Sequence, residues 1–396
     1  MKAGELLGPR IRIVAWILVL TGVAAFLAAL KQDPARAWGV LLFSNFYAIS
    51  LSLAGGVFIA SQYASSGTWS TVFRRVPEAM LAYVNQGWGP ALFFLTIIFG
   101  AGTIYPWTHA GWTGGIPYLQ GKAAYLSLRP VLLRAAIYFA IWIVLGRMLV
   151  RNSRLEDAAG GSHRYFKKNV IVSSVFLMLF AFSYSLASVD WTMSLSPHWT
   201  STMYPWYAWA SLFSSGLGLI ALFSILLRRR GVIPNFNRWH LYDLAKLVFA
   251  FCGFWAYVWF DQYMLIWYGN IPEEAVYFTL RGAGSWGGFT VLFWGNFIVN
   301  FIIPFLAIIS ARQKKREYVM VGVALLLLAG HWLDFYLMVM PAVMKGKALL
   351  GWPEIAISLG VGALFLLAFD GAFKDAPPVP QGDPYLQDSL QHCPSY

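Results

Sequence analysis

The sequence predicts an all-α, polytopic membrane protein with ten transmembrane helices. Hydrophobic residues make up 59% of the 396 residues and charged residues only 12%, and the mean hydropathy is +0.59. Soluble domains carry about 25% charged residues, so this chain belongs to a different class. Its apolar stretches are also long, and about 20 apolar residues are what a helix needs to cross a ~30 Å hydrocarbon core.

Ten apolar stretches are interpreted as spans. The first follows Lys2, Arg10 and Arg12 and lacks a small-residue cleavage site, so we expect an uncleaved anchor helix. The third and tenth stretches are the shortest. In chain order, the expected spans are residues 13–30, 38–63, 89–104, 124–150, 169–195, 203–227, 241–268, 282–310, 318–340 and 355–369.

The placement of basic residues predicts the orientation of the spans, because Lys and Arg are retained on the cytoplasmic side of a membrane. Nineteen of the 29 basic residues lie at the amino terminus, in the loops after spans two, four, six and eight, or in the tail. Only six lie in the opposite loops. We therefore expect both termini in the cytoplasm. The net charge of +12 reflects this topology and does not indicate a nucleic-acid partner.

The sequence shows no signature of a bound redox centre. Cys252 and Cys393 form neither a CxxC nor a CxxCH motif, so an iron–sulfur cluster or a covalent haem is not expected. Of the six histidines, only His331 lies deep in an expected span, which argues against a haem held by two histidines. We expect no cofactor and no metal in this chain.

Ionisable residues inside the spans are the candidate functional residues, because charges in hydrocarbon are costly and usually functional. Asp190, Asp261 and Asp334 lie five, seven and six residues before the outer ends of spans five, seven and nine. At ~1.5 Å per residue, they would lie roughly 7 to 11 Å below the outer surface. His331 shares a helix face with Asp334, and Arg134 in span four is a buried counter-charge near this layer.

Span seven extends the set of candidates toward the inner side of the membrane. Asp243 and Lys246 open this span, and a stripe of residues continues through Tyr257 to Asp261. Together with the outer acids, these residues would form part of a proton pathway.

Two interpretations of the buried charges stay open. Carboxylates and a histidine that face the interior of a helix bundle are what a proton relay requires. The same groups could instead form helix-locking pairs, Arg134 with an aspartate and His331 with Asp334, because buried pairs can be retained for packing specificity.

Five sequence segments carry a resemblance to a known family. They are SVDWTMSLSPHW (188–199), FDQYMLIWYGNIPEE (260–274), NFIIPF (300–305), GHWLDFYLMVMP (330–341) and RRVPEAM (74–80). Together they resemble the membrane subunits of bacterial alternative complex III, which are relatives of the polysulfide reductase (NrfD-like) membrane subunit. The tail motif DPYLQDSL (383–390) and the absence of a long extra domain make the chain most similar to the short, ActF-type subunits.

The resemblance implies an arrangement of two four-helix bundles, spans two to five and six to nine, with spans one and ten flanking them. The Pro-rich, polar tail is expected to be disordered or docked on a partner. The corresponding segments are an anchor helix at 1–37, the first bundle at 38–196, the second bundle at 197–343, the tenth helix at 344–373 and a cytoplasmic tail at 374–396.

The resemblance also implies a function. The chain would be an integral subunit of a quinol:cytochrome c or electron-acceptor oxidoreductase in the bacterial inner membrane, supporting assembly and a proton pathway without a redox centre of its own. Expected partners are subunits with haem c, a subunit with iron–sulfur clusters, a paralogous membrane subunit that could bind menaquinone, and lipids; a terminal oxidase could join them.

Two other functions stay open. The first is a quinone-binding catalytic subunit, although the family's quinol pocket uses a His of span three and an Asp of span four, and neither is present here. The second is a free-standing ion transporter, which fits the buried charges but not the family motifs.

Overall fold

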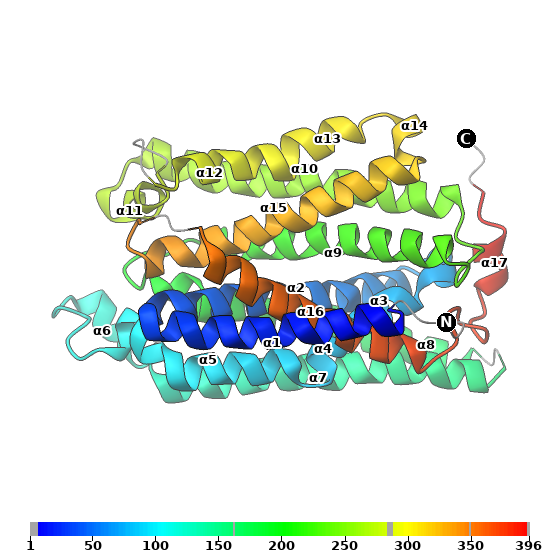
Figure 1. Ribbon diagram of the computed structural model, residues 1–396, viewed down its shortest axis with the longest axis horizontal. Coiled ribbons are helices and arrows are strands. Elements are labelled where there is room, and N and C mark those ends of the chain that lie inside the picture. Colours follow the sequence, from blue (N-terminus) through cyan, green and yellow to red (C-terminus); the bar gives the residue numbers. More distant parts are fainter. Residues whose placement is uncertain (1–6, 161–162, 283–287, 348–349, 394–396) are drawn as a thin grey trace.

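The computed structural model describes residues 7–160, 163–282, 288–347 and 350–393, and the regular structure in these ranges is helical throughout. The helices run roughly side by side along the long axis of the molecule (Figure 1). Both described chain ends lie at one end of this bundle, together with α17 (Leu386–Leu390), and we call it the basic end. The opposite end carries α6 (Pro117–Ala123) and α11 (Pro272–Leu280).

In the described ranges, nine helical segments are long and apolar enough to cross a membrane. They are α1 (Pro9–Gln32), α2 (Pro34–Ala64), α7 (Leu128–Ala158), α8 (Arg164–Trp191), α9 (Tyr204–Arg229), α10 (Arg238–Gly269), α15 (Glu317–Val343), α16 (Trp352–Lys374) and the segment 290–307. The expected third span is α5 (Trp88–Ile104), an apolar helix of only 17 residues. The all-α prediction is confirmed for the described residues, and the count of ten spans stays a prediction.

Shorter elements complete the chain. The segment 290–307 consists of α12 (Thr290–Phe297), a π-helical turn η4 (Ile298–Ile302) and α13 (Ile303–Ala307). The remaining short helices are η1 (Thr71–Phe73), α3 (Arg75–Met80), α4 (Ala82–Asn85), η2 (Pro106–Thr108), η3 (Met193–Leu195) and α14 (Ala311–Lys314).

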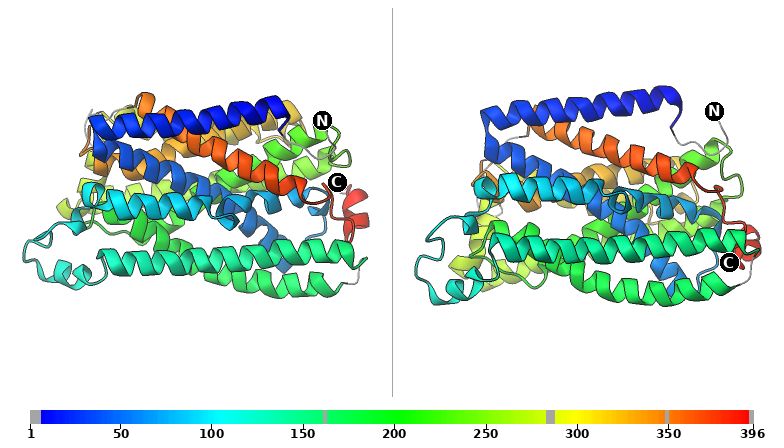
Figure 2. Two further views of the ribbon diagram at one scale, coloured as in Figure 1. Left: turned by 60° about the horizontal axis from the view of Figure 1, so that its bottom comes forward. Right: turned by 90° about the horizontal axis from the view of Figure 1, so that it is seen from below.

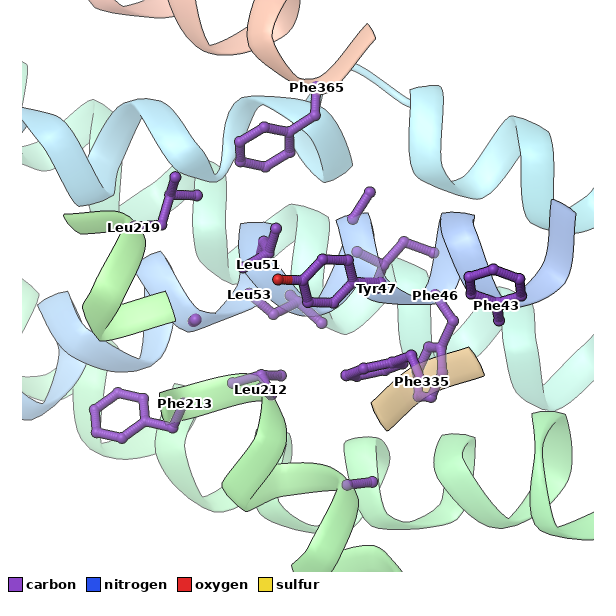
Figure 3. Close-up of a cluster of buried hydrophobic side chains, with 14 of the residues drawn as sticks. Phe43, Phe46, Tyr47, Leu51, Leu53, Leu212, Phe213, Leu219, Phe335 and Phe365 are labelled. Carbon is purple, nitrogen blue, oxygen red and sulfur yellow. The ribbon is translucent and has the colours of Figure 1, made fainter. Parts of the chain in front are cut away.

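Helices α2 and α9 form the centre of the molecule. In the most apolar 18-residue stretch of each, 94% of the residues are buried inside the protein. The two helices contact each other, α2 also packs on α5 and α8, and α9 also packs on α10 and α15. Small residues allow this approach, since a Cβ at Gly216 would lie 2.1 Å from the Cβ of Ala54. Aromatic side chains fill the space around α2, with Phe46 and Phe335 at a centroid distance of 5.2 Å (Figure 3).

Helices α1 and α16 lie together along one side of the bundle (Figure 2). Gly22 and Gly360 meet where these helices cross, and a Cβ on Gly22 would lie 2.7 Å from the Cα of Gly360. Much of α1 is apolar and exposed, as expected of a helix that faces lipid.

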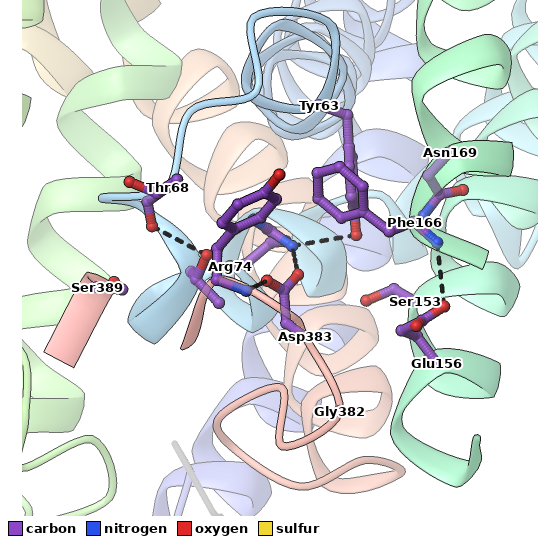
Figure 4. Close-up of polar contacts among 12 residues, drawn as sticks. Tyr63, Thr68, Arg74, Ser153, Glu156, Phe166, Asn169, Gly382, Asp383 and Ser389 are labelled. Atoms are coloured by element: carbon purple, nitrogen blue, oxygen red, sulfur yellow. Dashed lines mark hydrogen bonds and ion pairs between the residues drawn. The ribbon is translucent and has the colours of Figure 1, made fainter. Parts of the chain in front are cut away.

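The loop expected after span two is a buried segment. Residues 71–85 fold back beneath α2, where a Cβ on Gly55 would meet the carbonyl oxygen of Pro77 at 2.4 Å. Arg74 and Arg75 were expected at a cytoplasmic surface, but both are buried here. They are tolerated because Arg74 pairs with Asp383 of the tail (Figure 4) and Arg75 pairs with Glu78 and Asp157.

The described part of the tail, up to residue 393, lies on this chain's own basic end. Ser389 Oγ accepts a hydrogen bond from the backbone of Val72 and donates one to the carbonyl of Trp69. Three residues later, the carbonyl of His392 accepts from Asn237 Nδ2 at 3.2 Å. The tail therefore connects the buried segment after α2 to the start of α10.

Candidate functional site

The centre of the candidate site is the carboxylate of Asp334, which α15 places in the interior of the helix bundle with no exposed surface. Four neutral donors from three other helices surround it. Tyr207 Oη and Asn296 Nδ2 donate to Oδ1, the latter at 2.7 Å. Ser211 Oγ and Trp255 Nε1 donate to Oδ2 at 2.5 and 3.0 Å. Helices α9, α10, α12 and α15 thus converge on one acid.

The imidazole of His331 lies one helical turn from this carboxylate. Its Nδ1 is 3.5 Å from Asp334 Oδ2, and the side chain is fully buried. The edge of the ring meets Trp255, with a centroid distance of 5.5 Å. Among the described residues, neither ring nitrogen has a hydrogen-bond partner. Buried polar atoms of this kind are rare, and they often mark a place where a proton or a water is exchanged.

Two asparagines extend the site along the segment 290–307. Asn300 Nδ2 donates to Asn296 Oδ1 at 2.6 Å, and Asn300 Oδ1 is buried without a described partner. The π-helical turn falls at Asn300, and such turns occur frequently at functional sites. Gly330 is needed opposite this amide, since a Cβ there would lie 2.2 Å from Asn300 Oδ1.

The pair Arg134–Asp190 forms a second, separate site between α7 and α8. Arg134 Nε and Nη2 bind the two carboxylate oxygens at 2.8 and 3.0 Å, and Tyr138 Oη adds a bond of 3.0 Å. A bidentate arginine–carboxylate contact is strong and holds its partners in one orientation. This geometry fits the helix-locking interpretation of the pair.

Asp261 and Tyr257 lie away from both sites. Tyr257 is 61% exposed and Asp261 is half-buried, with no hydrogen bond or ion pair to any described residue. Trp259 and Gln262 of the same helix face the interior instead. With 3.6 residues per turn, Tyr257 and Asp261 occupy the face of α10 nearly opposite to Trp259. The expected stripe through Tyr257 to Asp261 therefore does not lead to Asp334. The five outer groups lie in three separate places: His331 with Asp334, Arg134 with Asp190, and Asp261.

Asp243 and Lys246 lie at the basic end and pair with each other at 2.5 Å. Asp243 also contacts Nε2 of His392 in the tail at 2.5 Å. Asp243 therefore helps to anchor the tail, a contact that the sequence pattern did not indicate.

The polar cluster of Figure 4 also lies at the basic end. Arg74 donates to Tyr63 Oη at 3.2 Å and to the carboxylate of Asp383. Burial alone would lower the pKa of the neighbouring Arg75, but the negative charges of Glu78 and Asp157 raise that pKa above its usual value. Burial likewise opposes the charge of Arg74, but the nearby Tyr63 and Asp383 raise the pKa of Arg74 above its usual value, so both arginines stay charged.

The sequence pattern missed Tyr207, Ser211, Trp255, Asn296 and Asn300. Each is an ordinary residue in an apolar helix, and only the packing of four helices brings them to one carboxylate. A weak signal was present, because Tyr207 and Ser211, like Asn296 and Asn300, are polar pairs spaced by four within apolar stretches.

Comparison with known proteins identifies no relative: no family model and no curated protein matches this sequence. Within the described ranges, no group of three or more His, Cys, Asp or Glu side chains is arranged to hold a metal ion. The function must therefore be argued from the site itself and from the sequence motifs.

Proposed function

We propose that this chain is a membrane subunit of a quinol-oxidising electron-transfer complex, and that Asp334 and His331 form a proton-relay site within it. The observation that carries the relay is the surroundings of Asp334, a fully buried acid held by four neutral donors next to an imidazole that has no hydrogen-bond partner among the described residues. The motif GHWLDFYLMVMP, which contributes to the resemblance, includes both residues.

The two buried aspartates differ in the cost of changing protonation state. Protonating Asp190 would leave the partly buried Arg134 without the carboxylate that compensates its charge, which is unfavourable. Asp334 has no arginine or lysine among its hydrogen-bond donors, so it can gain a proton without leaving a cationic side chain unpaired. The hydroxyls of Tyr207 and Ser211 can rotate to donate or accept as the acid changes state.

The proposal places the chain in the bacterial inner membrane with both termini in the cytoplasm. The position of both described chain ends at one end of the bundle supports placing them on the same side of the membrane (Figure 1), and the distribution of basic residues favours the cytoplasmic side. Partner subunits would carry haem c and iron–sulfur clusters, a paralogous membrane subunit would bind menaquinone, and a terminal oxidase could complete the assembly. This chain would contribute helices and a proton site without a redox centre.

Purification of the tagged chain from its native membrane tests this assignment. We expect the chain to co-purify with haem c subunits and with quinol oxidation activity, and to show no haem absorbance after separation from them. Isolation as a single component without quinol oxidation activity, or a stoichiometric haem in the separated chain, would contradict the proposal.

A further inference from the structure

Two cavities lie near the opposite end of the molecule, between the relay site and the surface. The outer cavity has a volume of about 630 Å³ and is lined by loop residues such as Ser201 and Met203, by α10 and by Glu274. The inner cavity has a volume of only about 10 Å³ and is lined by Tyr207, Tyr277 and Arg281 among others. Gln262 of α10 lines both cavities.

Gln262 has an unusual environment for a membrane-helix amide. Its side chain is only 4% exposed, and Nε2 has no hydrogen-bond partner among the described residues. An amide buried without a partner costs free energy, so such a position is unfavourable unless another molecule satisfies it. Between two cavities, the simplest molecule that can do so is water.

The inner cavity is suited to a single water molecule. A volume of about 10–15 Å³ is the minimum for one water, which also needs two to four polar partners. Tyr207, Gln262, Tyr277 and Arg281 supply polar groups around this volume. The hydroxyl of Tyr207 already donates to Asp334, so a water here would lie one residue away from the relay acid.

We propose that Gln262 is the gate of a water passage that joins Asp334 to the opposite face of the protein. This inference rests on the proposed proton relay. In the outward direction, the carboxyl proton of Asp334 passes to the oxygen of Tyr207 while Tyr207 gives its own hydroxyl proton to water in the inner cavity. The O–H bond of Asp334 breaks, one O–H bond breaks and one forms at Tyr207, and a new O–H bond forms on the water, which passes a proton on to water in the outer cavity. Gln262 is a positioning residue, because its amide orients the water and does not ionise.

Arg281 limits how long a proton can stay in the inner cavity. Its guanidinium donates to the carbonyls of Tyr277, Leu337 and Met338, which fixes a positive charge beside the passage. This charge disfavours a resident hydronium ion, whereas the negative charge of Asp334 favours one. The positive charge of Arg281 therefore opposes the accumulation of protons in the inner cavity.

Activity measurements with Gln262→Leu test the gate in the complete complex reconstituted in vesicles. We expect proton release per quinol to fall at least fivefold, while complex yield and quinol oxidation stay normal. Gln62→Leu is the matched control, because it removes another mostly buried glutamine, on α2, and should leave proton release unchanged. If Gln262→Leu fails to assemble, Gln262→Met replaces it as a closer match in shape.

Thiol labelling tests the passage without relying on proton transport. In a Cys393→Ser background, Met203→Cys in the outer cavity should react with a small membrane-impermeant thiol reagent added at the opposite face. Leu337→Cys, which lines the inner cavity, should react only when combined with Gln262→Ala. Labelling of Met203→Cys but not of the double variant would show that the cavities are not joined at Gln262 and would overturn the inference.

The failure of this inference can be distinguished from the failure of the relay. Normal proton release in Gln262→Leu, with release lost in Asp334→Asn, would reject the gate and keep the relay. Normal release in both variants would reject the relay itself, and with it the passage.

Discussion

The aspartates of the interior show how the surroundings of a residue decide its role. Asp190 receives two bonds from Arg134, so its charge is compensated and held in place. Asp334 receives its bonds from neutral donors beside His331. Asp261 has no described partner and lies on the outward face of α10. Three acids at similar positions in their spans thus occupy three different environments.

Substitution of Asp261 tests this distinction between environments. Asp261→Asn should leave proton release and complex yield near their normal values, because the side chain contacts neither the relay nor a described counter-charge. Asp190→Asn should lower the yield, because an arginine that loses its buried partner typically costs about 3 to 5 kcal/mol. Both variants would be measured for complex yield and for proton release in vesicles. A selective loss of proton release in Asp261→Asn would contradict this prediction and show that Asp261 belongs to the proton pathway.

At the scale of elements, the sequence predicts which residues share one side of a helix better than it predicts which side faces the protein interior. Spacing alone correctly put His331 and Asp334 on one face of one helix, because that relation is local. It extended the inner stripe through Tyr257, which the structure places on the outward side of α10, because which side of α10 faces inward depends on α9 and on the segment 290–307. The four donors around Asp334 could not be predicted for the same reason, as they come from three other helices.

The positions of the buried segment after α2 and of the tail are the hardest to predict from the sequence. Arg74 and Arg75 look like residues of a cytoplasmic loop, and their burial is explained by Asp383 of the tail, Asp157 of α7 and the neighbouring Glu78. The motif RRVPEAM contributes to the family resemblance but does not predict where the segment lies. Its position beneath α2 depends on the absence of a side chain at Gly55.

The tail anchor yields a stability prediction with a matched control. Asp383→Asn should destabilise the protein by about 3 to 5 kcal/mol, because it leaves the buried Arg74 without its carboxylate. Asp388→Asn removes an exposed acid from the same tail and should have little effect. Thermal unfolding of the purified protein would show the difference, together with the rate of proteolysis of the tail. Equal stability of the two variants would contradict the anchoring role.

At the scale of the whole molecule, the central helices α2 and α9 run between two ends of different character. The basic end is held by ion pairs such as Arg74–Asp383, and the opposite end contains the two cavities lined by Gln262. Composition and charge were sufficient to predict an all-α chain with long apolar helices, because both properties follow from the hydrocarbon core. The arrangement around α2 and α9 follows from small residues such as Ala54 and Gly216, whose partners cannot be assigned from one sequence. The relay site lies where α9, α10, α12 and α15 converge.

The central claim is that Asp334 carries protons during quinol oxidation, and proton release in reconstituted vesicles tests it most directly. Asp334→Asn preserves the shape of the side chain but removes its titratable proton. The account predicts normal yield and quinol oxidation with proton release lowered roughly 100-fold or more, which is the range that positioned acid–base groups contribute. Proton release at the normal rate from a fully assembled Asp334→Asn complex would contradict it.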